Sequence, residues 1–270
     1  MSQDIQAGHV SKKRVVYAMP GMEAMTVRRD QKYRATDADT LAMDLYYPTN
    51  FAGTRTPAVM FVTGFPDAGV RRMLGCAPKE MGSYISWAQL VAASGMVAIT
   101  YANEDPVTDV HAVLRYVRQN AAVLNVDENR MAVWACSGNV PNALSVLTED
   151  ARAYLKCAAL CYGYTLDLDG FARVADAARQ FGFVNPCAGK SVEDLPRDIP
   201  LFIARAGHDQ MPGLNEALDR FLATALTCNL PVTFANHSDA PHAFDLFHDS
   251  EISREIIRQT LGFLRFHLTA

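Results

Sequence analysis

The sequence predicts an α/β fold, with a mostly parallel sheet of about eight strands and helices on both faces. First, apolar runs of strand length alternate along the chain with segments of helical spacing. Second, several of these runs are apolar throughout, as expected for strands buried on both faces of a parallel sheet. Third, the chain has 270 residues, of which 50% are hydrophobic and 20% charged. We therefore expect one globular domain over residues 1–270.

The predicted sheet begins with two paired strands and continues as a parallel series. Residues 25–30 and 41–48 have strand character, and Asp37-Ala38-Asp39 between them indicates an antiparallel hairpin. A turn at 127–129 is predicted before the central strand. The later strands are apolar runs at 58–62, 96–101, 130–136, 158–162, 201–207 and 231–235.

Segments of helical spacing separate these strands, and each presents one apolar face. The stretch through Arg71, Arg72 and Met73 is predicted to be a loop. The predicted helix faces are Tyr84, Trp87, Ala88 and Val91; Val110, Val113, Leu114 and Val117; Leu214, Leu218, Phe221, Leu222 and Ala225; and Ile252, Ile256, Leu261 and Leu264.

The segment from Tyr164 to Asp198 is too long for a direct crossover between two strands. It contains a helical piece from Phe171 to Phe181 and several prolines. Such a composition is typical of a small lid or inserted subdomain beside a site. We therefore predict a lid or insertion at 164–198.

Charge and hydropathy exclude several classes of partner. The net charge is −4 at pH 7 and the chain has no long basic run, so nucleic acid is not an expected partner. The N-terminal residues lack the apolar core of a signal peptide, and there is no span of about 18 apolar residues. We expect a cytoplasmic protein that does not bind membranes.

The six cysteines lie in apolar surroundings without a C-x-x-C pair. Cys157 and Cys161 would be more than about 12 Å apart in a strand, too far for a disulfide or a shared metal. We expect reduced thiols and no metal site.

Three side chains with the chemistry of a nucleophilic relay follow the ends of predicted strands. Ser137, Asp209 and His242 come after the strands at 130–136, 201–207 and 231–235. The carboxyl ends of parallel strands share one edge of a sheet, where ligands bind. We therefore expect these three side chains to lie together at one edge of the sheet, with Ser137 as the candidate nucleophile.

Ser137 stands where a strand turns into a helix, which projects a side chain above the sheet. The flanking near-contact positions are usually glycine and are Ala135 and Asn139 here. Asn is expected to fit because it tolerates left-handed backbone better than most residues. The neighbouring Cys136 would bring the indole of Trp134 into a glycine position, so register favours the serine. An N-cap role for Ser137 remains the alternative.

Each of the other two positions has rivals. His237 and His208 are alternative bases, and Asp167 and Asp169 are alternative acids. Asp209 could instead cap a helix beginning near residue 212.

With these motifs in place, the sequence resembles the α/β-hydrolase family, and within it the serine esterases of the dienelactone-hydrolase-like branch. The resemblance runs from about residue 40 to the C-terminus. Dienelactone hydrolases proper use a cysteine where this chain has Ser137, which argues against dienelactone as substrate. The resemblance rests on 44–48, the turn at 63–69, the corner at Ser137, 206–209 and 241–245.

In that family the serine is acylated, the histidine is the base and the aspartate orients it, which implies these roles for Ser137, His242 and Asp209. The resemblance also implies an oxyanion hole and a substrate pocket. Thr63-Gly64 replaces the usual His-Gly, which leaves the amide of Phe65 to bind the oxyanion with that of Gly138. Met73, Trp87 and Phe171 are candidate pocket residues, although core packing is the simpler interpretation of each.

We expect a carboxylesterase-type serine hydrolase that needs no cofactor and acts on a small-molecule ester. A peptidase or lactonase with the same three residues, or a non-catalytic small-molecule receptor on the same fold, remains open. Assembly into a homodimer is also left open.

Overall fold

The computed structural model describes residues 10–36, 40–49, 51, 53, 55–148, 153–170 and 173–269. Within this part of the chain, eight strands form one sheet in the order β1-β2-β4-β3-β5-β6-β7-β8. β1 pairs antiparallel with β2, and β2 pairs antiparallel with β4. All further pairs are parallel. The strands are β1 (Thr26–Ala35), β2 (Thr40–Tyr47), β3 (Thr56–Phe61), β4 (Val97–Tyr101), β5 (Val126–Cys136), β6 (Leu155–Cys161), β7 (Leu201–Ala206) and β8 (Val232–His237).

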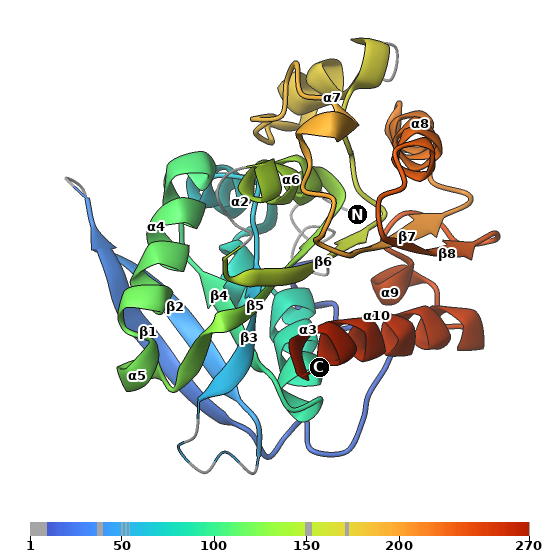
Figure 1. Cartoon of the computed structure of the whole chain (residues 1–270). Helices are drawn as coiled ribbons and strands as arrows, with labels where there is room; N and C mark the ends of the chain where they lie inside the picture. Colours follow the sequence, from blue (N-terminus) through green and yellow to red (C-terminus); the bar gives the residue numbers. More distant parts are fainter. Residues whose placement is uncertain are drawn as a thin grey trace.

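Helices cover both faces of the sheet, because the central strands are buried on both sides (Figure 1). On one face α3 and α10 pack through residues such as Trp87 and Leu264. On the other face α4, α6 and α8 pack through Val113, Leu144 and Phe221. The helices are α2 (Asp67–Leu74), α3 (Gly82–Ala93), α4 (Pro106–Gln119), α5 (Ala121–Leu124), α6 (Val140–Thr148), α7 (Val174–Phe181), α8 (Leu214–Thr227), α9 (Phe244–Phe247) and α10 (Glu251–Thr269).

The predicted fold class is confirmed: a mostly parallel sheet lies between two layers of helices. The antiparallel pairing of β1 and β2 agrees with the expected hairpin. The residues Asp37, Ala38 and Asp39 of its predicted turn lie outside the described part of the chain.

Two local predictions were wrong. The expected loop through Arg71, Arg72 and Met73 is helix α2, which ends at Gly75 with a φ of 81°. The expected turn at 127–129 lies inside β5. There the pairing with β3 jumps from Thr56↔Val126 to Ala58↔Met131, so the polar run is accommodated as an irregularity within the strand.

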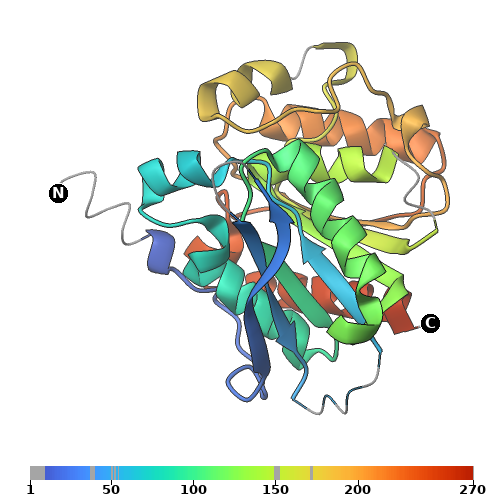
Figure 2. The same ribbon diagram turned by 90° about the vertical axis from the view of Figure 1, so that its left-hand side faces the viewer.

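The segment around α7 lies at one margin of the molecule, above α8 in the view of Figure 2. Its described helix begins at Val174, three residues later than the expected piece at Phe171. Phe171 itself lies outside the described residues. None of the helices that the structure describes has the length and apolar character needed to span a bilayer.

Candidate active site

Ser137 lies at a sharp corner between β5 and α6. The strand ends at Cys136, a single 3-10 turn covers Ser137–Asn139, and α6 starts at Val140. Ser137 has a φ of 56°, in the left-handed region that non-glycine residues avoid. Such a conformation costs on the order of 1–3 kcal/mol and persists only where the surrounding structure enforces it. The corner therefore holds Ser137 in a strained backbone conformation, which presents its hydroxyl above the sheet.

His242 links Ser137 to Asp209. The Oγ of Ser137 lies 2.9 Å from Nε2 of His242. The Nδ1 of His242 lies 2.6 Å from Oδ2 of Asp209, whose side chain is fully buried. The other oxygen of Asp209 accepts the backbone N–H of Met211 at 2.9 Å. The carboxylate therefore has a fixed orientation toward the imidazole.

Close packing of two loops brings Asp209 and His242 together. The N–H of Gly207 donates to the carbonyl of His237, and the N–H of His208 donates to that of Ala240. A Cβ at Gly207 would lie 2.1 Å from the carbonyl oxygen of Ser238. Only glycine permits this approach between the loops that follow β7 and β8.

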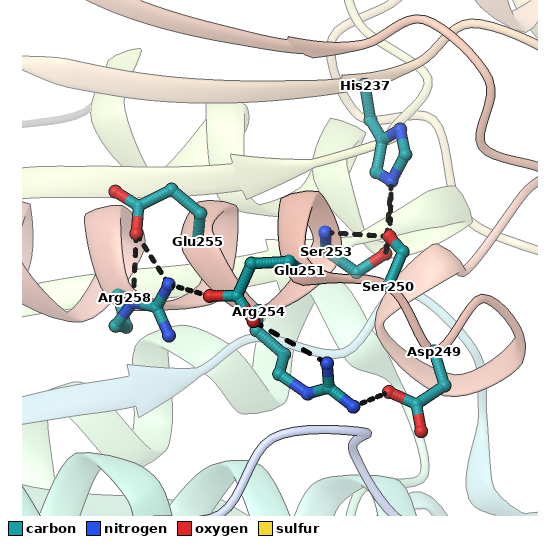
Figure 3. Close-up of polar contacts among 8 residues, drawn as sticks. All are labelled: His237, Asp249, Ser250, Glu251, Ser253, Arg254, Glu255 and Arg258. Carbon is teal, nitrogen blue, oxygen red and sulfur yellow. Dashed lines mark hydrogen bonds and ion pairs between the residues drawn. The ribbon is translucent and has the colours of Figure 1, made fainter.

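The rival residues predicted for these positions lie elsewhere. His237 is buried, and its Nε2 contacts Ser250 and Ser253 at the start of α10 (Figure 3). His208 is exposed at the molecular surface. Nδ1 of His242 is in contact with Asp209, so Asp209 holds the position for which Asp167 and Asp169 were the alternatives. The side chain of Asp169 lies outside the described part of the structure. Asp209 caps no helix, because α8 begins only at Leu214.

Asn139 has a different role from the one expected. Its backbone is not left-handed; among the corner residues it is Ser137 that has a positive φ. The side chain of Asn139 instead accepts the N–H of Gly64 at 2.7 Å and donates to the carbonyl of Cys136 and the hydroxyl of Tyr84. It thus ties the loop after β3 to the corner.

The two predicted oxyanion residues are neighbours. A Cβ at Gly138 would lie 2.8 Å from Cζ of Phe65, and one at Gly64 would lie 2.5 Å from the carbonyl oxygen of Gly138. The loop therefore touches the corner only because both positions are glycine. Since Asn139 occupies the N–H of Gly64, the next amide along the loop is that of Phe65. The role of the two amides at Phe65 and Gly138 remains a prediction.

Asn103 also anchors the loop at 63–67, which follows β3. Its Nδ2 lies within hydrogen-bond distance of Thr63 Oγ1, Phe65 O and Asp67 Oδ1, at 3.0, 3.2 and 2.9 Å. Burial raises the pKa of Asp67 to about 7, against a smaller lowering by its hydrogen bond with Asn103. No spacing in the sequence joins Asn103 to residues 63–67, because the contact is made only in the folded sheet.

A largely apolar cavity of about 190 Å³ opens at Ser137 and His242. Two of the predicted pocket residues, Met73 and Trp87, line it, whereas Phe171 lies outside the described residues. The other apolar or aromatic lining residues are Phe65, Val70, Leu74, Pro78, Met81, Tyr84, Trp134, Tyr162, Ala243 and Leu246.

Cys136 also lines this cavity beside Ser137. Burial raises the pKa of its thiol to about 12, so the thiolate is scarcely populated at neutral pH. The imidazole of His242 contacts Ser137 rather than this sulfur. Among the described residues there is no group of three or more His, Cys, Asp or Glu side chains arranged to hold a metal ion.

The segment at 164–198 packs directly on the corner and its neighbouring loop. The N–H of Val184 donates to the carbonyl of Gly64 at 2.8 Å. The Phe183 ring stacks on Tyr164 and meets the Phe65 ring edge-on, with centroids 5.1 and 5.9 Å apart. This segment therefore forms one wall beside the predicted oxyanion loop.

Comparison with known proteins identifies the fold. An esterase from Pseudomonas putida superposes with a TM-score of 0.72 at 18% identity, over 99% of this chain and 91% of that one. An α/β hydrolase from the metagenome of Lake Arreo, Spain, gives 0.72 at 17% identity, over 99% and 88%. The chain has the α/β-hydrolase fold. Vibralactone cyclase shares it, with a TM-score of 0.68 at 16% identity over 93% and 82%.

The sequence matches no protein-family model and none of the curated proteins with which it was compared. At these identities the structural neighbours show the α/β-hydrolase fold alone. The chemistry has to be argued from the residues of the site. Placement in the dienelactone-hydrolase-like branch accordingly stays a prediction.

Proposed function

We propose that this protein is a serine hydrolase that cleaves carboxylic esters through an acyl-enzyme intermediate. The observation that carries the proposal is the contact chain from Ser137 through His242 to Asp209, which opens on an apolar cavity. It is further supported by the left-handed backbone of Ser137, since strain at a corner is typical of a nucleophile.

In the proposed mechanism His242 removes the hydroxyl proton of Ser137 as the oxygen attacks the ester carbonyl. Asp209 holds the imidazole in the required tautomer and stabilises its charged form. The amides of Gly138 and Phe65 bind the developing oxyanion, each lowering the barrier by about 3–4 kcal/mol. His242 then returns the proton to the departing alcohol. Water, activated by the same base, hydrolyses the acyl-enzyme and releases the acid.

The size of the cavity limits the substrate. An apolar cavity of about 150 Å³ holds a benzene ring, so the cavity of about 190 Å³ would accept a ring or a short branched chain. We expect kcat/KM for p-nitrophenyl esters to be highest for acyl groups of about this volume and to fall for long linear chains.

The test is hydrolysis of acetyl, butanoyl, hexanoyl, benzoyl and decanoyl esters by the wild-type protein, with Ser137→Ala as the control. Hydrolysis of none of them, or equal hydrolysis by the control, would refute the proposal. Lactones and peptides belong in the same panel, because a lactonase or peptidase could use the same three residues. The receptor alternative predicts binding of such compounds without turnover.

The segment at 164–198 is proposed to act as a lid that selects the acyl group. Replacing only α7, Val174–Phe181, by a short linker leaves the contacts of Phe183 and Val184 with the oxyanion loop in place. The preference between short and long esters should change more than the hydrolysis of acetyl esters. Equal losses on all esters, in a variant with a native circular-dichroism spectrum, would contradict the lid role.

A further inference from the structure

Asp245 is a second buried carboxylate near the candidate active site. It lies three residues after His242, is 2% exposed and lines the same cavity. Each of its oxygens has one donor: Oδ2 accepts Nε1–H of Trp87 at 2.6 Å, and Oδ1 accepts the hydroxyl of Tyr162 at 2.7 Å. Trp87 belongs to α3 and Tyr162 follows β6. The carboxylate therefore joins the histidine loop to two other elements.

Tyr162 carries this connection to the imidazole. Its ring meets the ring of His242 edge-on, with centroids 5.2 Å apart and planes at 73°. Its φ of 36° is unfavourable for a tyrosine, so its position depends on its contacts. The hydrogen bond to Asp245 holds the far end of the same ring. The side chain of Tyr162 is thus fixed between Asp245 and His242.

The chain between His242 and Asp245 turns back sharply. Ala243 has a φ of 53°, and α9 begins at Phe244. The carbonyl of Asp245 also accepts the N–H of Val16, which anchors this turn to the N-terminal segment. These contacts fix the backbone that carries His242 at a point three residues beyond it.

We propose that Asp245 is a positioning residue for His242. Together with Trp87 and Tyr162 it holds the histidine loop and the ring beside the imidazole, and its negative charge favours the imidazolium formed while Ser137 reacts. The inference deepens the proposed function and rests on it for the role of His242 as base.

Of the titratable groups that face Asp245, His242 is the one whose protonation responds to the charge of Asp245. The titratable side chains around it are Cys136 on β5, Cys161 on β6, Tyr162 and His242. Burial raises the pKa values of both thiols and of the phenol, so all three are neutral near pH 7. Burial also raises the pKa of Asp245 itself, and the hydrogen bonds from Trp87, Tyr162 and its own backbone oppose that rise, as does His242.

The test compares Asp245→Asn and Tyr162→Phe with the wild-type protein and with Asp109→Asn. Asp109 is a matched control: it is a fully buried carboxylate, bonded to Arg34 and to the backbone of Glu104 and Asp105. For each protein kcat and KM of one short ester are measured from pH 5 to 9. The midpoint of the His242 titration is followed separately by NMR, with His242→Ala to assign its signal.

Asp245→Asn should lower kcat roughly tenfold to a hundredfold with little change in KM, by analogy with the groups that orient metal-bound histidines, whose loss costs about that factor. The pH midpoint of kcat/KM and the NMR midpoint should both fall, because a neighbouring negative charge is lost. Tyr162→Phe keeps that charge and should lower kcat with a smaller shift. Asp109→Asn should reduce the melting temperature and leave both midpoints unchanged.

Wild-type kcat and midpoints in folded Asp245→Asn would overturn the inference. So would a rise in KM alone, which would make Asp245 a passive wall of the cavity. Should Asp245→Asn fail to fold, Tyr162→Phe decides, and an unchanged kcat and NMR midpoint there would overturn it. The NMR midpoint requires no turnover. If the wild-type protein hydrolyses no ester, the proposed function is refuted. The NMR midpoints still measure whether Asp245 is coupled to His242.

Discussion

The described part of the molecule contains two serine–histidine clusters, which differ in their surroundings. In the site cluster, Ser137, His242 and Asp209, the histidine lies 2.9 Å from the serine and 2.6 Å from the carboxylate. In the latch cluster, His237, Ser250 and Ser253, the histidine lies 3.2 and 3.1 Å from two serines (Figure 3). The same residue types therefore occur in both clusters, but a carboxylate contacts the imidazole only in the first.

The latch cluster has none of the other features of a nucleophilic site. Nδ1 of His237 is buried and has no hydrogen-bond partner among the described residues. Burial, and next the neighbouring His248, lower the pKa of His237, which favours the neutral imidazole. Neither Ser250 nor Ser253 has left-handed backbone, and neither lines the cavity at Ser137. The latch cluster joins the end of β8 to the start of α10.

A serine–histidine contact becomes a candidate catalytic relay only through the groups that surround it. The site cluster combines a strained corner, a buried carboxylate and an open cavity. In the latch cluster, by contrast, His237 and Ser253 are buried, and the ion pairs of Arg254 and Arg258 lie nearby on the partly exposed side of α10.

The largest expected effect is on the nucleophile. Ser137→Ala should lose on the order of 10⁶ in kcat, as triad serines do, whereas Ser250→Ala and Ser253→Ala should keep wild-type kcat. A serine-directed phosphonate should label Ser137 alone, as mass spectrometry would show. Cys136→Ala should keep most activity at some cost in stability. Label on Cys136, or full activity in Ser137→Ala, would reverse the assignment.

The second prediction concerns the base. A histidine base has a reference pKa near ~6.5, so kcat/KM should rise from about pH 6 to 8 and then level. His242→Ala should abolish this rise along with most of the activity, and His237→Asn should preserve it. The measurement is kcat/KM for one ester across that range. A lost rise in His237→Asn with a normal profile in His242→Ala would show that the two clusters have been interchanged.

The sequence predicted the strand ends well because burial on both faces imposes apolar runs that are visible in one dimension. Ser137 and Asp209 could be chosen since each follows such a run, whereas His242 follows β8, a largely exposed edge strand. The hydrogen bonds of Asn103 and Asp245 join residues far apart in the chain, so no spacing in the sequence indicates them. Helix α2 was missed because its charged residues hide the helical pattern, although Gly75 offered a stop signal.

The third prediction concerns Asp67 in the loop beside the site, whose burial is expected to lower the stability of the protein at neutral pH. The pKa of Asp67 is raised to about 7 from a usual value near 4, so the folded state holds its proton more tightly than the unfolded chain. The stability contributed by this group is full below about pH 4 and is lost as pH rises through 7. Asp67→Asn has no such loss, and its amide oxygen can still accept from Asn103.

We therefore expect the advantage of Asp67→Asn in unfolding free energy to grow between about pH 4 and 7 and then level, at up to a few kcal/mol. Urea unfolding at pH 4, 6 and 8 measures this difference in unfolding free energy. The control is Asp109→Asn, which removes another buried carboxylate and should destabilise the protein at pH 8. An advantage that shrinks with rising pH would contradict the assignment.

The smallest effect is expected in the latch cluster. Ser253→Ala removes one of two hydroxyls that contact Nε2 of His237 and leaves Ser250 in place, so the loss should be only about 1 kcal/mol. That corresponds to roughly 2–4 °C in melting temperature for a domain of this size. The pH profile and kcat should not change, because the site cluster is held by other loops. A fall in kcat beyond the loss of folded protein would mean that the latch cluster also positions His242, and the contrast between the two clusters would then fail.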